Sequence, residues 1–141
     1  MRPKYHVLFS FLFSAGLFFF FPRITLLGAI VIFMGAVLID VDHYLYYVFK
    51  KKDLSLRRAY RFFIMQLHVA RKHKEHYQSP LCIFHTVEAL ILMTVLALYS
   101  KIWLYVLVGS LLHFVLDLYE TLIVHKNIGL RVYTLYPYFK K

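Results

Sequence analysis

Residues 36–47 read AVLIDVDHYLYY, and they place three ionisable side chains where a long apolar run ends. Asp40, Asp42 and His43 follow the stretch 24–39, which contains no charged residue. A charged side chain at the centre of a membrane helix costs about 2.5–3.5 kcal/mol. These three side chains therefore need partners from elsewhere in the chain.

The composition is typical of a membrane protein. The chain has 141 residues, 61% of them hydrophobic, with 14 Phe and 12 Tyr. A soluble domain is closer to half apolar, and this length suits one domain. We expect a single membrane-embedded domain over residues 1–141, with a soluble protein built on a buried core as the alternative. The only cysteine, Cys82, excludes an internal disulfide and is expected to be a small buried hydrophobe.

Four apolar runs predict an all-α fold, an integral-membrane four-helix bundle. The runs cover residues 5–21, 24–40, 80–99 and 102–124. A spanning helix needs about 20 apolar residues, with about 17 as the lower limit, so the last two runs meet this length and the first two are shorter. Two-residue links make each pair an antiparallel hairpin. The first run also resembles a signal peptide, but no small-residue cleavage site follows it.

Basic residues are concentrated on one side of the predicted membrane. The side with both termini and residues 40–79 carries 15 of the 17 Lys and Arg, whereas the side of the two turns carries Arg23 and Lys101. Cytoplasmic loops are rich in basic residues. We therefore expect a multi-pass protein of the cytoplasmic (inner) membrane with both termini in the cytoplasm. This topology explains the net charge of +10 without nucleic acid as a partner.

A basic segment between the hairpins predicts an amphipathic interfacial helix. Apolar side chains recur there at helical spacing: Leu56, Tyr60, Phe63, Leu67 and Ala70. Ser55 is placed to cap this helix, and arginines occupy the rest of its surface. We expect the helix to lie on the anionic inner leaflet of the lipid bilayer; the alternative is a solvated basic loop. His68, His73 and His76 are expected on the solvated face or as an accessory ligand.

Ionisable residues fall at matched depths in the four runs. Depths are counted from the turns at about 1.5 Å per residue. One level holds His6, Asp40, His85 and Asp117, and a second level holds Glu88 and His113. If the ionisable residues of the four helices had unrelated roles, they would not be expected to lie at the same depth.

Spacing within each run also groups these residues. His85 and Glu88 are three residues apart, and His113 and Asp117 are four apart, so each pair is expected to share a helix face. In the opening stretch, a break in the helix would let its two aspartates and its histidine converge.

This arrangement predicts a metal site. Imidazole and carboxylate groups are ligands of zinc, manganese and iron, and two divalent cations would offset four carboxylates. The candidate ligands are His6, Asp40, Asp42, His43, His85, Glu88, His113 and Asp117. No cysteine is expected to supply a thiolate. The alternative is a set of interhelical hydrogen bonds and His–Asp pairs without a metal.

In order and approximate spacing, these residues resemble the YdjM-type family of LexA-regulated inner-membrane metal-dependent hydrolases. The family pattern is an N-terminal His, an L-P-D-I-D-H segment, a Thr-His-Ser segment opening a helix, and a late H-x-x-x-D. The matching stretches are YHVLFS, LIDVDHYL, FHTVE and LLHFVLDLYE, spread along the whole chain. Pro80 stands where the family often has a His, Ile39 replaces a Pro, and a Thr-Pro after the last Asp is absent.

The resemblance implies a membrane-bound hydrolase. The family is remotely similar to the zinc-dependent phospholipase C and nuclease clan, whose zinc ions cleave phosphoesters. It implies a metal-activated water acting on a phosphoester or phospholipid headgroup, with zinc as the first expectation for the ion. Asp42 or Glu88 would act as the catalytic base, and Asp40 or Asp117 could bridge ions. The alternatives are a non-enzymatic protein that transports or senses metal ions or protons, and a structural subunit.

Overall fold

The computed structural model describes residues 3–72 and 82–120, and every regular element within them is a helix. The elements are α1 (Pro3–Phe20), α2 (Leu26–Leu38), α3 (Val41–Lys51), α4 (Leu56–Lys72), the short 3-10 helix η2 (Ile83–His85), α5 (Val87–Ala97) and α6 (Lys101–Tyr119). The predicted all-α fold is confirmed over these residues.

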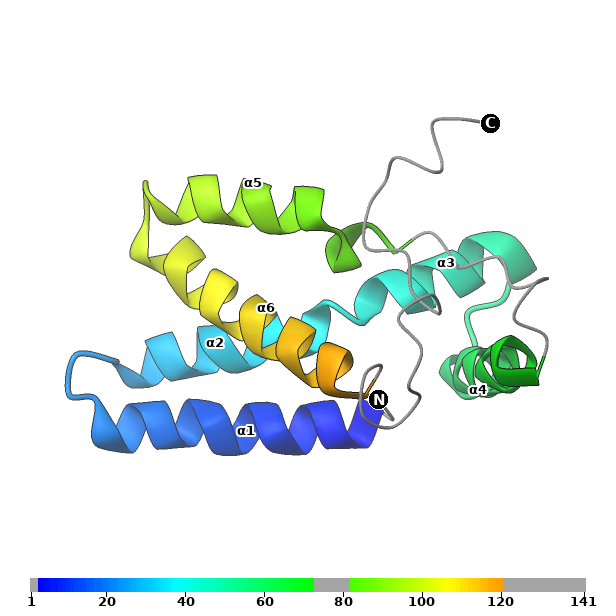
Figure 1. Cartoon of the computed structure of the whole chain (residues 1–141), viewed down its shortest axis with the longest axis horizontal. Coiled ribbons are helices and arrows are strands. Elements are labelled where there is room, and N and C mark those ends of the chain that lie inside the picture. The colour runs from blue at the N-terminus through cyan, green and yellow to red at the C-terminus, as the bar shows by residue number, and fades with distance from the viewer. Residues whose placement is uncertain (1–2, 73–81, 121–141) are drawn as a thin grey trace.

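Two antiparallel helix pairs bring distant parts of the sequence to one end of the molecule. The turn between α1 and α2 and the turn between α5 and α6 lie at the same end, on the left of Figure 1. α2 packs on α6 at the centre, α1 packs on α2, and α5 packs on α6. The opposite end therefore gathers the start of α1, the junction of α2 and α3, the start of α5 and the end of α6.

Two of the described helical segments are long and apolar enough to cross a membrane. They are Leu26–Lys51, formed by α2 and α3 together, and α6; α1 and α5 are apolar but shorter. The prediction that residues 80–99 form one full-length helix is wrong. Thr86 has an extended backbone, so α5 starts only at Val87 and has 11 residues. A helix of that length is about 16 Å long, roughly half the thickness of a bilayer core.

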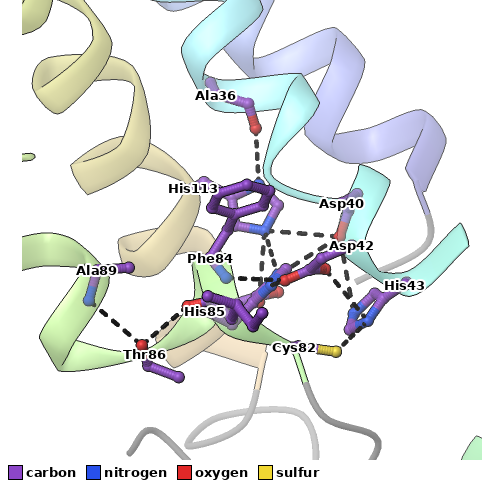
Figure 2. Close-up of polar contacts among 12 residues, drawn as sticks. Ala36, Asp40, Asp42, His43, Cys82, Phe84, His85, Thr86, Ala89 and His113 are labelled. Carbon is purple, nitrogen blue, oxygen red and sulfur yellow. Dashed lines mark hydrogen bonds and ion pairs between the residues drawn. The ribbon is translucent and has the colours of Figure 1, made fainter. Parts of the chain in front are cut away.

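A short break between α2 and α3 redirects the opening stretch of the sequence. The Asp40 N–H bonds to the Val37 carbonyl at 3.3 Å, and the Asp42 N–H bonds to the Ile39 carbonyl at 3.4 Å. These bonds join residues three apart, as in a 3-10 helix, whereas the bonds of a regular α-helix join residues four apart. The break turns the side chains of Asp40, Asp42 and His43 toward one another, as Figure 2 shows.

Glycines at the crossing of α2 and α6 allow the two backbones to touch. A Cβ atom on Gly109 would lie 2.1 Å from the Ile32 carbonyl oxygen, and one on Gly35 would lie 2.9 Å from the Val106 carbonyl oxygen. Such contacts leave no room for a side chain, which is why small residues are frequent where helices cross closely. The contact brings His113, one helical turn beyond Gly109, against α2.

The described residues bury polar side chains and expose large apolar ones. Polar residues no more than 2% exposed include His6, Ser10, Thr86, Ser110 and His113. Large apolar residues more than half exposed include Phe11, Leu12, Phe19, Leu27 and Ile91. A monomeric soluble protein rarely exposes so much contiguous apolar surface. Among the described residues, the large apolar side chains thus lie on the outside of the helices and many polar ones lie inside.

α4 is attached to α3 by aromatic contacts. Ala59 is buried, the Phe62 ring packs on Tyr47 with centroids 5.4 Å apart, and the Phe63 ring packs on His43 at 5.1 Å. The exposed Leu56 and Tyr60 lie elsewhere on the helix. The predicted apolar face is therefore divided, since Phe63 faces α3 while the other two remain uncovered.

Asp53 fastens the connection between α3 and α4. Its carboxylate accepts hydrogen bonds from the Tyr47 hydroxyl, from the Ser55 N–H at 3.0 Å and from Arg58 Nε at 2.8 Å. The Tyr47 hydroxyl and then the Ser55 N–H hold the pKa of Asp53 below its usual value. Ser55 Oγ in turn accepts the Arg58 N–H at 3.4 Å, as predicted for an N-cap.

Replacing Gly109 by alanine should push α2 and α6 apart. We expect Gly109→Ala to lower the free energy of unfolding by about 1–3 kcal/mol, the usual range for overpacking. Gly16→Ala is the matched control, because nothing lies within 4 Å of a Cβ at that position; it should stabilise the helix by about 0.5–1 kcal/mol. Thermal unfolding of the purified variants measures both. Equal stability of the two variants would contradict the backbone contact.

Candidate metal centre

His113 is held in one tautomer by the backbone of α2. Its Nδ1 lies 2.7 Å from the Ala36 carbonyl oxygen, and the side chain is fully buried. A carbonyl oxygen can only accept a hydrogen bond, so Nδ1 carries the proton. In the neutral ring Nε2 then presents a lone pair to the space between α2, α6 and η2. A histidine that binds a metal commonly makes this kind of bond through its other nitrogen.

His85 is oriented in the same way by a carboxylate. Its Nδ1 lies 3.1 Å from Asp42 Oδ2, and that oxygen also accepts the Phe84 N–H at 3.0 Å. Because a carboxylate is an acceptor, Nδ1 of His85 carries the proton and Nε2 carries the lone pair. The turn of η2, closed by the Thr86 N–H bonding to the Ile83 carbonyl at 3.3 Å, sets this ring against α3.

The remaining nitrogens of the two rings face each other. His85 Nε2 and His113 Nε2 are 3.1 Å apart, as the centre of Figure 2 shows. Asp40 Oδ1 lies 3.5 Å from the first nitrogen and 3.7 Å from the second, and Asp117 Oδ2 lies 3.8 Å and 3.5 Å from them. Two nitrogens and two carboxylate oxygens thus surround one small volume.

This donor set fits a divalent cation. Two nitrogens bound to one zinc ion at about 2.0–2.1 Å stand about 3.0–3.4 Å apart, which matches the separation of the two Nε2 atoms. Histidine with aspartate is a common ligand combination for zinc and for manganese or iron. His85, His113 and Asp117 form one of the buried groups that could hold an ion.

His6 supports the centre from α1. Its Nε2 lies 3.2 Å from Asp117 Oδ1, the oxygen that does not face the two lone pairs, and its ring stacks on His113 with centroids 4.3 Å apart. His6 therefore orients Asp117, and with Asp40 and His113 it also belongs to a second group that could hold a metal.

A third group lies on the α3 side of the centre. It consists of Asp42, His43, Cys82 and His85. Cys82 Sγ is 2.6 Å from His43 Nδ1, and His43 Nδ1 is 3.6 Å from Asp42 Oδ1. Cys82 is buried, as expected, but the expectation that no cysteine is positioned to supply a thiolate is wrong, because Cys82 belongs to this group. The signal in the sequence was the C-x-x-H spacing of Cys82 and His85, because a 3-10 turn folds those two residues to one side.

Glu88 does not join these residues. It is exposed in the first turn of α5, and none of the three groups includes it. The prediction that Glu88 shares a helix face with His85 is wrong, because the extended Thr86 separates η2 from α5. The second predicted level is wrong as well, since His113 contacts the first-level residues His85 and Asp117.

The other seven predicted ligands lie together at one end of the helices. They are His6, Asp40, Asp42, His43, His85, His113 and Asp117, and Cys82 is added to them. The accessory candidates His73 and His76 and the divergent Pro80 lie outside the described residues, and the side chain of His68 is not described either.

The centre is accessible from one side. The side chains of His113, Asp117, His85 and Asp42 are no more than 7% exposed, whereas those of Asp40 and His43 are 28% and 31% exposed. Asp40 and His43 therefore form the more exposed rim of the centre, beside α3. No protein-family model, curated protein or solved structure matches this chain.

Removing the cap of α5 should disturb His85. Thr86 Oγ1 accepts the Ala89 N–H at 3.3 Å and donates to the Ile83 carbonyl at 2.8 Å, joining η2 to α5. We expect Thr86→Val to lower the free energy of unfolding by about 1 kcal/mol. Thr94→Val is the control, because the Thr94 hydroxyl bonds only within its own helix, to the Leu90 carbonyl, at an exposed site. Chemical denaturation of both variants measures the difference, and a larger loss in the control would contradict this role.

Proposed function

We propose that the protein is a membrane-bound, metal-dependent hydrolase that acts on a phosphoester or a phospholipid headgroup. Its cation is held at the cytoplasmic end of a four-helix membrane bundle by His85, His113 and Asp117, with Asp40 beside it. The proposal is supported by the geometry of this centre and by the resemblance of its residues, in order and spacing, to a family of membrane hydrolases.

The observation that carries the proposal is the pair of facing lone pairs. His85 Nε2 and His113 Nε2 approach to 3.1 Å although the opposite nitrogen of each ring already holds a proton. When both rings are neutral, these two nitrogens are both acceptors and cannot form a hydrogen bond with each other. The two lone pairs repel each other, but a cation between the two nitrogens would attract both of them. Such a cation would account for the orientation of both rings.

The surrounding charge favours a divalent cation over a proton. Asp40 and Asp117 each face both nitrogens within 4 Å, and Asp117 is buried. Burying uncompensated carboxylates costs several kcal/mol each. One divalent ion offsets both negative charges, whereas protons would have to be held by two of the neighbouring histidines to do the same.

If bound in this position, a divalent ion would lower the pKa of a bound water to about 7 and would polarise a phosphoester oxygen. The chain supplies the remaining groups. Asp40 lies beside both nitrogens and is partly exposed, so it can accept a proton from the attacking water. We propose this role for Asp40 rather than for Asp42, whose Oδ2 is occupied by Phe84 and His85, or for the distant Glu88.

The placement in a membrane is supported by the distribution of side chains. Large apolar residues cover the outside of α1, α2, α5 and α6, while polar residues lie inside. Among the described residues, the end with the metal centre carries Lys50, Lys51, Lys52, Arg57, Arg58 and Arg61, and the end with the turns carries Arg23 and Lys101. By the positive-inside rule the centre faces the cytoplasm, and α4 lies on the anionic leaflet with Leu56 and Tyr60 in the lipid.

The second candidate function is transport of a metal ion or a proton. One observation favours it: Ser10 and Ser14 continue the buried face of α1 from His6 toward the far side of the molecule. Ser14 donates to the Phe11 carbonyl at 3.1 Å, as serines in apolar helices often do. Buried serines also serve close helix packing, so we rank transport below hydrolysis.

Metal content tests the centre. Detergent-purified protein should hold a divalent metal in stoichiometric amount, as measured by elemental analysis. We expect Asp117→Asn and His113→Ala to weaken metal binding beyond the roughly 10–100-fold that loss of a supporting residue causes. Glu88→Gln is the matched control, since Glu88 lies outside the described ligand groups, and it should retain the metal. A wild-type protein without metal, at unchanged helix content, would contradict the proposal.

Substrate turnover distinguishes the two candidate functions. We expect the metal-loaded protein to hydrolyse bis(p-nitrophenyl) phosphate or a short-chain phospholipid, and Asp40→Asn to lower kcat about 10²–10⁴-fold, the range for loss of a general base. The same variant should keep its helix content by circular dichroism. Zinc flux into proteoliposomes that is lost in Ser10→Ala, together with no hydrolysis, would establish transport instead.

A further inference from the structure

We propose that the centre holds a second cation, bound by the thiolate of Cys82 with His43 and Asp42. This inference rests on the proposed metal-dependent function and specifies it further. The three ligands come from the start of α3 and from the residue before η2, and they lie on the more exposed side of the first position. Figure 2 shows Cys82 and His43 together beside Asp42 and apart from His113.

Asp42 is the first argument for a second position. Its Oδ2 accepts two hydrogen bonds, from Phe84 N–H and His85 Nδ1–H. Its Oδ1 is buried and accepts no hydrogen bond from the described residues, and it points toward His43 Nδ1 at 3.6 Å. A buried carboxylate oxygen without a donor is costly. A cation beside His43 would satisfy it.

Cys82 is the second argument. It is a buried residue whose Sγ lies 2.6 Å from His43 Nδ1, within a group of four side chains whose ligand atoms all lie within 4.8 Å of one another. Sulfur and nitrogen ligands of one zinc ion stand about 3.5 Å apart. Binding therefore requires the thiolate and the imidazole to separate by about 1 Å. The His43 side chain is 31% exposed and lies between the rings of His85 and Phe63, with centroids 4.7 Å and 5.1 Å away.

The charges of the two positions balance separately. The first position has the carboxylates of Asp40 and Asp117, and the second has the carboxylate of Asp42 and the thiolate of Cys82. Each pair carries two negative charges, which one divalent cation offsets. Asp42 joins the positions, because one of its oxygens orients His85 for the first cation and the other faces the second.

A thiolate ligand also selects the metal. Thiolates favour zinc over magnesium, calcium or manganese, which prefer oxygen ligands. With three protein ligands the second position retains an open coordination site, as catalytic zinc sites do. Since it lies at the rim, next to the exposed Asp40 and His43, this open site would face an incoming phosphate oxygen. We therefore assign the second cation as zinc.

X-ray absorption at the zinc edge tests this assignment. Detergent-purified, zinc-loaded protein should hold two zinc ions per chain and show a sulfur neighbour at about 2.3 Å. The chain has one cysteine, so a thiolate signal can come only from Cys82. In Cys82→Ser the sulfur neighbour should disappear and the zinc content should fall from two ions to one. Glu88→Gln is the control and should keep both.

Alkylation of the wild-type protein gives a test that needs no variant to fold. We expect zinc to slow the reaction of Cys82 with iodoacetamide at least tenfold relative to the metal-free protein. Two results would overturn the second position and leave the proposed function standing: one zinc per chain without a sulfur neighbour, or alkylation of Cys82 at the same rate with and without zinc. If that common rate is high, Cys82 is instead a nucleophile paired with His43. Absence of any bound zinc would overturn the second position, and absence of every divalent metal would overturn the proposed function too.

Discussion

The contact between the backbones of α2 and α6 is the constraint on which the rest of the centre depends. Gly109 has no side chain, so the Ile32 carbonyl can occupy the space where a Cβ would be. One turn later, His113 meets the Ala36 carbonyl at 2.7 Å, and this bond fixes which nitrogen carries its proton. Any larger residue at the crossing would move α6 away from α2 and release His113 from its tautomer.

Burial makes this arrangement costly without a cation. His113 and Asp117 lie among helices whose outer surfaces are apolar, where an unpaired charge or an unmatched lone pair is poorly solvated. The outer atoms of the ligands are satisfied: His113 and His85 donate to the Ala36 carbonyl and the Asp42 carboxylate, and His6 contacts Asp117. The inner atoms, which are Nε2 of His85 and of His113 and Oδ2 of Asp117, face one another. In metal centres, too, the outer atoms of the ligands are hydrogen-bonded and the inner atoms face the ion.

The break between α2 and α3 gives the centre its open side. A continuous helix would have directed Asp42 away from Asp40 and His43, whereas two tight i to i+3 bonds turn all three inward. The same break carries α3 outward, where α4 is fastened to it through Asp53 and Phe62. The rim of the centre and the basic helix are thus parts of one short segment, which suits a site that receives an anionic substrate.

The sequence by itself determined that the fold is helical, and it identified most of the candidate ligands. Long apolar runs cannot form anything but helices when their backbone must satisfy its own hydrogen bonds, and the matched depths of His6, Asp40, His85 and Asp117 are visible by counting residues. Counting could not place Glu88, because it assumes that a helix is unbroken and Thr86 breaks this one. It did not place Cys82 either, because the apolar run around this residue indicated a buried hydrophobe and the C-x-x-H spacing with His85 was not used. Only the tertiary structure decided which nitrogen of each histidine is available, since that depends on acceptors such as the Ala36 carbonyl, which lies 77 residues away in the chain.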